Sequence, residues 1–191
     1  MPTLEGLALE VAGCTRCALA ASRTQTVFGM GDPRADLMFV GEGPGAEEDR
    51  QGLPFVGKSG QLLDRLMFEE IGITRDRCFI CNTVKCRPPG NRDPDPDEVA
   101  ACRPYLEQQI DLIEPKVVIT LGNFATRLLL DSPLGITKLR GRVYPFRQGS
   151  LIPTFHPAAA LRAGGDTVAA MRADFVRAKQ ALTTVASLAA G

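Results

Sequence analysis

The chain has 191 residues, of which 45% are hydrophobic and 23% charged, and its formal net charge is zero. This length suits a single core, so we expect residues 1–191 to form one domain. The composition is that of a soluble globular protein. No apolar run approaches membrane-spanning length, and the first residues do not resemble a signal peptide. We therefore expect a cytoplasmic protein that makes no membrane contact, and the neutral charge indicates no overall attraction to nucleic acid.

Short apolar runs alternate with helical patterns along the chain. The expected strands are hydrophobic on both faces, as in buried parallel sheets, and cover residues 36–41, 78–84, 116–121 and 151–155. The expected helices cover residues 4–12, 59–71, 96–113, 123–130 and 168–182. This alternation predicts an α/β fold, a three-layer α/β/α sandwich around a short four-stranded parallel sheet.

Polar or flexible residues follow each predicted strand. Gly41-Glu42-Gly43 follows the first strand, Asn82 ends the second, Gly122 follows the third and His156 follows the fourth. Ligands of parallel sheets bind at the carboxyl ends of the strands, so we expect the site there. His156 is the only histidine, and we interpret it as functional. The Asn82 carboxamide donates and accepts together, which suits recognition of a base edge, although an Asn at this position also forms turns.

Residues 52–59 match the phosphate-binding pattern G-x-x-x-x-G-K-[ST]. A working P-loop follows a buried strand, whereas the residues before Gly52 are charged. Pro54 also lacks an amide hydrogen that could bind a phosphate. We therefore reject nucleotide hydrolysis for this segment. We expect a loop that presents Phe55, either as a stacking face or as part of the core.

Six cysteines in a reducing compartment indicate metal ligation or burial rather than disulfides. Cys78 and Cys81 lie in a predicted strand, where positions three apart face opposite sides, so we interpret them as buried thiols. The other four combine one close pair with two single cysteines near prolines. This spacing favours an iron–sulfur cluster weakly, and leaves a zinc site and simple burial open. These four are Cys14, Cys17, Cys86 and Cys102.

Two stretches carry basic residues without any acidic residue. The longer stretch covers residues 132–165 and includes Lys138, Arg140 and Arg162, and the shorter covers residues 85–92. Such a localised basic face is compatible with phosphate contacts. Two solvated loops would explain the same pattern equally well.

Four segments, in this order, resemble the family-four uracil-DNA glycosylases, which carry an iron–sulfur cluster. They are Gly41-Glu42-Gly43-Pro44-Gly45, Gly52 to Lys58, Asn82 to Pro89, and His156-Pro157-Ala158. The resemblance extends from about Cys14 to Arg162. It implies an α/β/α sandwich and a [4Fe-4S] cluster held by Cys14, Cys17, Cys86 and Cys102.

The resemblance also implies how a base is recognised. Uracil is flipped out of the DNA into a pocket, where Phe55 stacks on its ring. Asn82 accepts from uracil N3–H and donates to O4, a pattern that cytosine presents in reverse. Glu48 occupies the space beside C5 and excludes the methyl group of thymine.

Further residues are implied in the chemistry and in DNA binding. His156, with backbone amides at Gly41 and Gly43, stabilises the negative charge that develops on uracil O2. Glu42 is expected to orient the attacking water and the cationic sugar, although a carboxylate here could also brace the loop. The expected DNA contacts are a wedge and three basic side chains, namely Leu161, Lys138, Arg140 and Arg162.

We therefore expect a monomeric DNA glycosylase that removes uracil from single- or double-stranded DNA and leaves an abasic site. The alternatives are a non-catalytic iron–sulfur module that binds nucleic acid and, less favoured, a P-loop nucleotide hydrolase. The sequence does not show the strand preference, activity on hypoxanthine, redox activity of the cluster, or recruitment by a sliding clamp.

Overall fold

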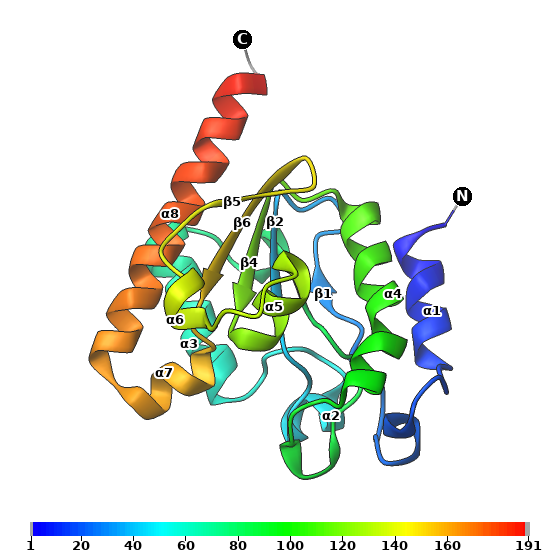
Figure 1. Cartoon of the computed structure of the whole chain (residues 1–191). Coiled ribbons are helices and arrows are strands. Elements are labelled where there is room, and N and C mark those ends of the chain that lie inside the picture. The colour runs from blue at the N-terminus through cyan, green and yellow to red at the C-terminus, as the bar shows by residue number, and fades with distance from the viewer. Residues whose placement is uncertain (1, 190–191) are drawn as a thin grey trace.

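The computed structural model describes residues 2–189 and shows a sheet enclosed between helices (Figure 1). The sheet has six strands in the order β1-β3-β2-β4-β6-β5. Its centre is parallel and consists of β3 (Phe79–Asn82), β2 (Leu37–Gly41), β4 (Val117–Leu121) and β6 (Gly149–Thr154). The predicted α/β fold and parallel centre are confirmed.

The predicted number of four strands was wrong, because each edge of the sheet carries one more strand. β1 (Met30–Gly31) pairs antiparallel with β3, and β5 (Tyr144–Phe146) pairs antiparallel with β6. These strands contain only two and three residues, too few to show a hydrophobic period.

One face of the sheet is covered by a helical layer built from two distant parts of the chain. It consists of α3 (Lys58–Leu66), its π-helical continuation (Met67–Ile71) and α8 (Gly165–Ala189). Alternate strand residues such as Phe39 and Ile119 belong to the core cluster on this face. The rings of Phe39 and Phe175 lie 5.7 Å apart, which fixes α8 against the sheet.

The opposite face is covered by α1 (Leu4–Ala12), α4 (Pro96–Ile113) and α5 (Asn123–Leu130), whose bounds are those predicted. Met38 and Val118 pack there with residues of α4. Cys78 belongs to the first core cluster and Cys81 to the second. The two thiols therefore lie on opposite faces and are both buried, as predicted.

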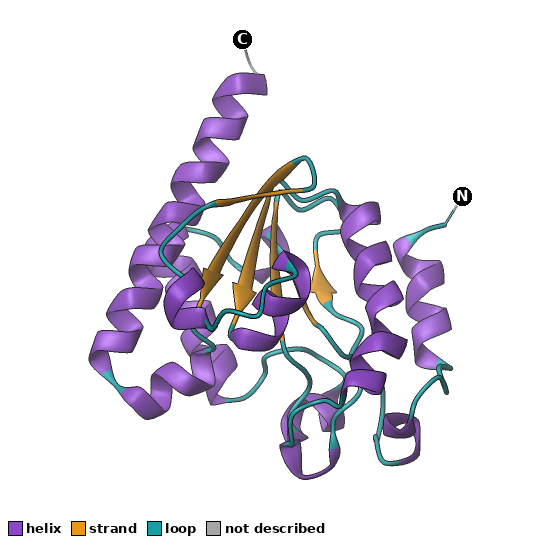
Figure 2. Ribbon diagram, viewed as in Figure 1, coloured by secondary structure: helices purple, strands orange, loops and turns teal. Residues whose placement is uncertain are grey.

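Several short helices lie in the loops around the sheet. Figure 2 shows most of them below the arrowheads of the parallel strands, where the chain leaves the sheet. The α-helices are α2 (Ala46–Gln51), α6 (Ile136–Leu139) and α7 (Pro157–Ala163). Short 3₁₀ turns cover Ala18–Ala21, Arg75–Arg77 and Pro89–Asn91. None of the helices described in the structure is both long and apolar enough to cross a membrane.

Candidate active site

A cavity of about 640 Å³ lies at the carboxyl ends of the parallel strands. Each of the four strands is followed by residues that line it: Glu42 after β2, Asn82 at the end of β3, Asn123 after β4 and His156 after β6. The topology therefore brings together around one cavity side chains that are up to 114 residues apart (156 minus 42) in the sequence.

Asn82 presents an unusual acceptor to this cavity. The residue is 2% exposed, and its Oδ1 is the single buried side-chain nitrogen or oxygen atom in residues 2–184 without a hydrogen-bond partner. Leaving such an atom unpaired costs about 1–3 kcal/mol, so proteins rarely retain one without a reason. The Asn82 oxygen is therefore available to accept a hydrogen bond from a ligand N–H.

Phe55 is both a core residue and a wall of the cavity. Its side chain is 5% exposed and belongs to a core cluster, yet it also lines the space next to Asn82. The ring centroid lies 5.7 Å from that of His156, with the planes inclined by 30°. The backbone is left-handed, with a φ of 53°. Phe55 is thus a core residue that also lines the cavity.

The carboxylate of Glu48 is bound by backbone amides of two loops. Oε1 accepts hydrogen bonds from the amides of Val56 at 2.9 Å and Gly57 at 3.2 Å. Oε2 accepts from the amide of Gly45 at 3.1 Å. Glu48 also lines the cavity, so its carboxylate forms a fixed wall beside the Phe55 loop.

His156 begins α7, and its ring is fixed by the first turn of that helix. Nδ1 accepts a hydrogen bond from the amide of Ala158 at 3.1 Å. Burial, reinforced by the nearby charge of Arg162, lowers the pKa of His156 to about 4, against a weaker opposing effect of Glu48. The imidazole is therefore neutral at physiological pH. Because Nδ1 is the acceptor, the proton is on Nε2, which is a hydrogen-bond donor.

Glu42 provides a carboxylate in the same cavity. Burial raises its pKa, and the negative charge of Asp93 raises it further. Asp93 lines the cavity too, as do Phe124 and Arg127, and the sequence did not indicate any of these three. Asp93 lies in a proline-rich loop and Arg127 in a helix, where charged residues are usual, so no sequence signal distinguished them.

Comparisons with known proteins identify the family of this chain. The family model described as "Uracil DNA glycosylase superfamily" matches residues 28–182. The "Type-4 uracil-DNA glycosylase" of Sulfurisphaera tokodaii is 49% identical over 170 residues, which are 84% of this chain and 77% of that protein. The chain belongs to the type-4 uracil-DNA glycosylases.

Other relatives place this type-4 glycosylase within the wider superfamily. The "Type-4 uracil-DNA glycosylase" of Thermotoga maritima is 47% identical over 161 residues, which are 83% of each chain. The "Type-5 uracil-DNA glycosylase" of Thermus thermophilus is 30% identical over 141 residues, 66% of this chain and 62% of that protein.

The expected DNA contacts of the type-4 glycosylase lie in different environments. Arg162 lines the cavity, Leu161 is 48% exposed on α7, and Lys138 is exposed on α6. By contrast, Nε and Nη2 of Arg140 donate to the two carboxylate oxygens of Asp174, each at 2.9 Å, and Asp174 is fully buried. This pair occupies the guanidinium group that was expected to bind a phosphate.

Four thiols of the type-4 glycosylase surround a second, smaller cavity. Cys14 and Cys17 follow α1, Cys86 follows β3, and Cys102 lies on α4. All four are free, and burial raises the pKa of the Cys102 thiol to about 11. Arg23 donates to the sulfur of Cys86 at 3.4 Å.

These thiols form an all-sulfur donor set around one space. Four cysteines line it, and their neighbours Arg23 and Lys85 carry positive charge that would balance thiolates. Such a donor set is of the kind that holds an iron–sulfur cluster, and four cysteines also hold zinc in other proteins.

Proposed function

We propose that this chain hydrolyses the bond between uracil and deoxyribose in DNA and leaves an abasic site. The unpartnered Oδ1 of buried Asn82 carries the proposal. Uracil offers an N3–H donor next to an O4 acceptor, and a side-chain amide complements both. Cytosine offers an acceptor and a donor in the opposite order, so it would leave buried polar groups unpaired on both sides.

The walls of the cavity suit a single flipped pyrimidine. The base must leave the DNA stack to reach Asn82, and the ring of Phe55 then stacks on one of its faces. The carboxylate of Glu48 lies beside C5 in this proposal. Because three backbone amides hold it in place, it cannot move aside for the methyl group of thymine.

His156 stabilises the departing base. Negative charge develops on uracil O2 as the glycosidic bond breaks, and a neutral imidazole with its proton on Nε2 donates a hydrogen bond to that oxygen. The low pKa of His156 supports this role, because no proton has to be gained before the reaction. Backbone amides at Gly41 and Gly43 would assist the same oxygen.

Glu42 acts on the other side of the glycosidic bond, at the sugar. Its carboxylate orients the attacking water and offsets the positive charge that the sugar ring acquires. The neighbouring Asp93 adds negative charge to the same region. Leu161 fills the gap that the flipped nucleotide leaves in the stack, and Arg162 and Lys138 bind phosphates.

The four thiols hold a [4Fe-4S] cluster in this proposal. When bound, the cluster would link the chain segments that supply Cys14, Cys17, Cys86 and Cys102, and we assign it this structural role. The segment after α1 would thereby be fixed to α4 and to the loop that follows Asn82. We further propose that residues 1–191 act as one domain and as a cytoplasmic monomer on DNA.

An oligonucleotide with one uracil tests the proposal. After incubation with the protein and heating in alkali, the strand should break at the uracil position, whereas matched strands with thymine or cytosine should stay intact. A non-catalytic module would bind the uracil strand and leave it alkali-stable, which would contradict the proposal. A P-loop hydrolase would instead release phosphate from ATP.

A further inference from the structure

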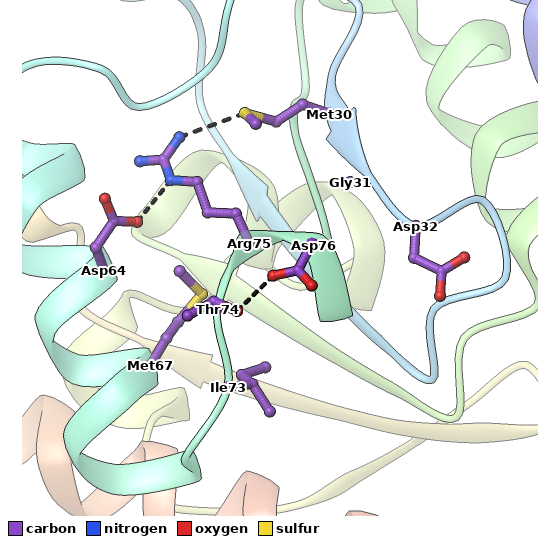
Figure 3. A pocket seen from close by; sticks show the side chains of 9 residues that line it. All are labelled: Met30, Gly31, Asp32, Asp64, Met67, Ile73, Thr74, Arg75 and Asp76. Carbon is purple, nitrogen blue, oxygen red and sulfur yellow. Dashed lines mark hydrogen bonds and ion pairs between the residues drawn. The ribbon is translucent and has the colours of Figure 1, made fainter.

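A third cavity, a hollow of about 840 Å³, is lined by residues of β1, α3 and the Arg75–Arg77 turn. Figure 3 shows the side chain of Arg75 in this hollow, between Met30 and Asp64. The guanidinium group also reaches the backbone of the segment that carries Phe55. Arg75 therefore connects this third cavity to Phe55, a wall of the cavity at the strand ends.

The fork of Arg75 is fully engaged. Nη1 donates to the carbonyl oxygen of Pro54 at 2.8 Å, and Nη2 donates to that of Phe55. Nε donates to Oδ1 of Asp64 at 2.6 Å, and the Sδ of Met30 lies 3.5 Å from Nη1. The side chain of Arg75 is only 19% exposed, so its bonds to the two carbonyl oxygens are partly shielded from water, whereas Asp64 is 48% exposed.

Phe55 needs such support because its backbone is left-handed. A φ of 53° is unfavourable for a bulky residue, and neighbouring groups must hold it. Arg75 binds the carbonyl oxygen of Phe55, while Glu48 binds the two amides that follow it. Gly60 leaves room for this carbonyl, since a Cβ there would lie 1.6 Å from the oxygen.

We infer that Arg75 is a positioning residue for uracil recognition, which it serves by holding the backbone of Phe55 so that the ring faces the base. The inference rests on the stacking role of Phe55 in the proposed function. Two carbonyl oxygens and a carboxylate need a planar group with several donors in fixed directions, which arginine has and lysine lacks. The positioning role therefore requires the planar guanidinium group of Arg75 as well as its positive charge.

The test compares Arg75→Ala, Arg75→Lys and Phe55→Ala with the unaltered protein. The inhibition constant of free uracil measures stacking on the base. The affinity for DNA with an abasic site measures DNA binding without a base. Arg75→Ala should weaken uracil inhibition about 10-fold, within the usual range of base–aromatic stacking, and leave the affinity for abasic DNA unchanged. The inhibition constant of uracil for Arg75→Lys should lie between those for Arg75→Ala and the unaltered protein. Arg77→Ala, an exposed arginine on the same turn, is the matched control.

A double variant separates positioning from general destabilisation. If Arg75 acts through the ring, adding Arg75→Ala to Phe55→Ala should cause no further loss of uracil binding. Additive losses would overturn the inference. Thermal midpoints identify unfolding, and if Arg75→Ala does not fold, Arg75→Lys is compared in the same cycle.

The two proposals fail in distinguishable ways. If Phe55→Ala excised uracil and bound it like the unaltered protein, the stacking role itself would be wrong. If Phe55→Ala were impaired while a folded Arg75→Ala remained normal, only the inference on Arg75 would be wrong.

Discussion

The side-chain oxygen of Asn82 lies so close to Gly41 that a Cβ on the glycine would come within 2.4 Å of it. The two residues are register partners on β2 and β3. The same Cβ would also lie 2.6 Å from the ring of Phe55. The amide of Asn82 and the ring of Phe55 thus both occupy the space that a side chain at Gly41 would fill. The cavity keeps its shape only if this residue is glycine.

Gly41→Ala should therefore abolish most uracil excision. The added methyl group must displace Asn82 or Phe55, and a displacement of about 1 Å in a reacting complex costs on the order of 10² in rate. Single-turnover excision measures the loss. Gly165→Ala is the matched control, because a Cβ at Gly165 would meet nothing within 4 Å. Full activity of Gly41→Ala would show that the base does not bind beside Asn82.

Asn82→Asp should reduce excision and selectivity. An ionised carboxylate accepts hydrogen bonds but cannot donate to uracil O4, and an unpaired buried group costs about 1–3 kcal/mol, or roughly 5- to 150-fold. Rates on uracil and cytosine strands would be compared. Asn123→Asp is the control, because Asn123 lines the same cavity and uses only its oxygen, which accepts from the amide of Ile136. Equal losses in both variants would indicate a general charge effect.

His156→Ala should act on the transition state. Loss of one oxyanion donor costs about 10²–10³ in rate, so single-turnover excision should fall by that factor. Affinity for uracil-containing DNA should change little, because the charge on O2 appears only during the reaction. The thermal midpoint is measured on the same preparation. A variant that is destabilised but excises uracil normally would leave His156 with only the role of capping α7, and Glu42 would become the leading catalytic candidate.

The pH dependence should follow Glu42. Its carboxyl must be ionised to act on water and sugar, and its pKa is raised above the ordinary value of 4.5. Excision should therefore fall as the pH decreases through this raised pKa, at a pH where His156, with a pKa of about 4, is still neutral. Asp93→Asn removes a negative charge that disfavours ionisation, so it should shift this decline to lower pH.

Asp97→Asn is the control for this shift, because Asp97 is exposed in the first turn of α4. An identical decline in Asp93→Asn and in the unaltered protein would contradict the coupling. A decline that persists in Glu42→Gln would assign it to another group.

The proposed iron–sulfur cluster at Cys14, Cys17, Cys86 and Cys102 predicts a coloured protein. Purified protein should be yellow-brown and contain iron and inorganic sulfide. Cys86→Ser should bleach it and impair folding, whereas Cys81→Ser should not, because Cys81 is buried in a different core cluster. Visible absorbance and metal analysis check both. Colourless, fully active protein that contains zinc would end the cluster assignment.

Hydrophobic periodicity predicted the main elements because burial decides them. The helix expected over residues 96–113 has the bounds of α4, whose first turn carries Asp97 and Glu98 where a helix favours acidic residues.

The short helices were not predicted because α2, α6 and α7 contain only six, four and seven residues, too few to show a helical period. Two of them have local caps: Glu48 accepts from the amide of Gly45, and His156 accepts from that of Ala158. Both side chains were expected to face a ligand, so their capping roles were missed.

The site residues at the strand ends could be predicted, but the residues that hydrogen-bond to other parts of the site could not. The rule that parallel strands end at one edge pointed to Asn82 and His156. Arg75, by contrast, lies 20 residues from Phe55, and Asp174 lies 34 residues from Arg140. Such pairs involve ordinary surface residue types, so only the folded chain shows that they are committed to each other.

α7 has a mechanical consequence. His156 caps its first turn, and Leu161 and Arg162 lie on its last one, so one short helix carries both the imidazole and the side chains proposed to contact DNA. In the proposed function, a force from the stacked bases on Leu161 would act on the helix that orients Nε2. Contact with the duplex and alignment of the hydrogen-bond donor would then be coupled. A free nucleoside makes no such contact, so it should receive little help from the imidazole even when its base fits the cavity.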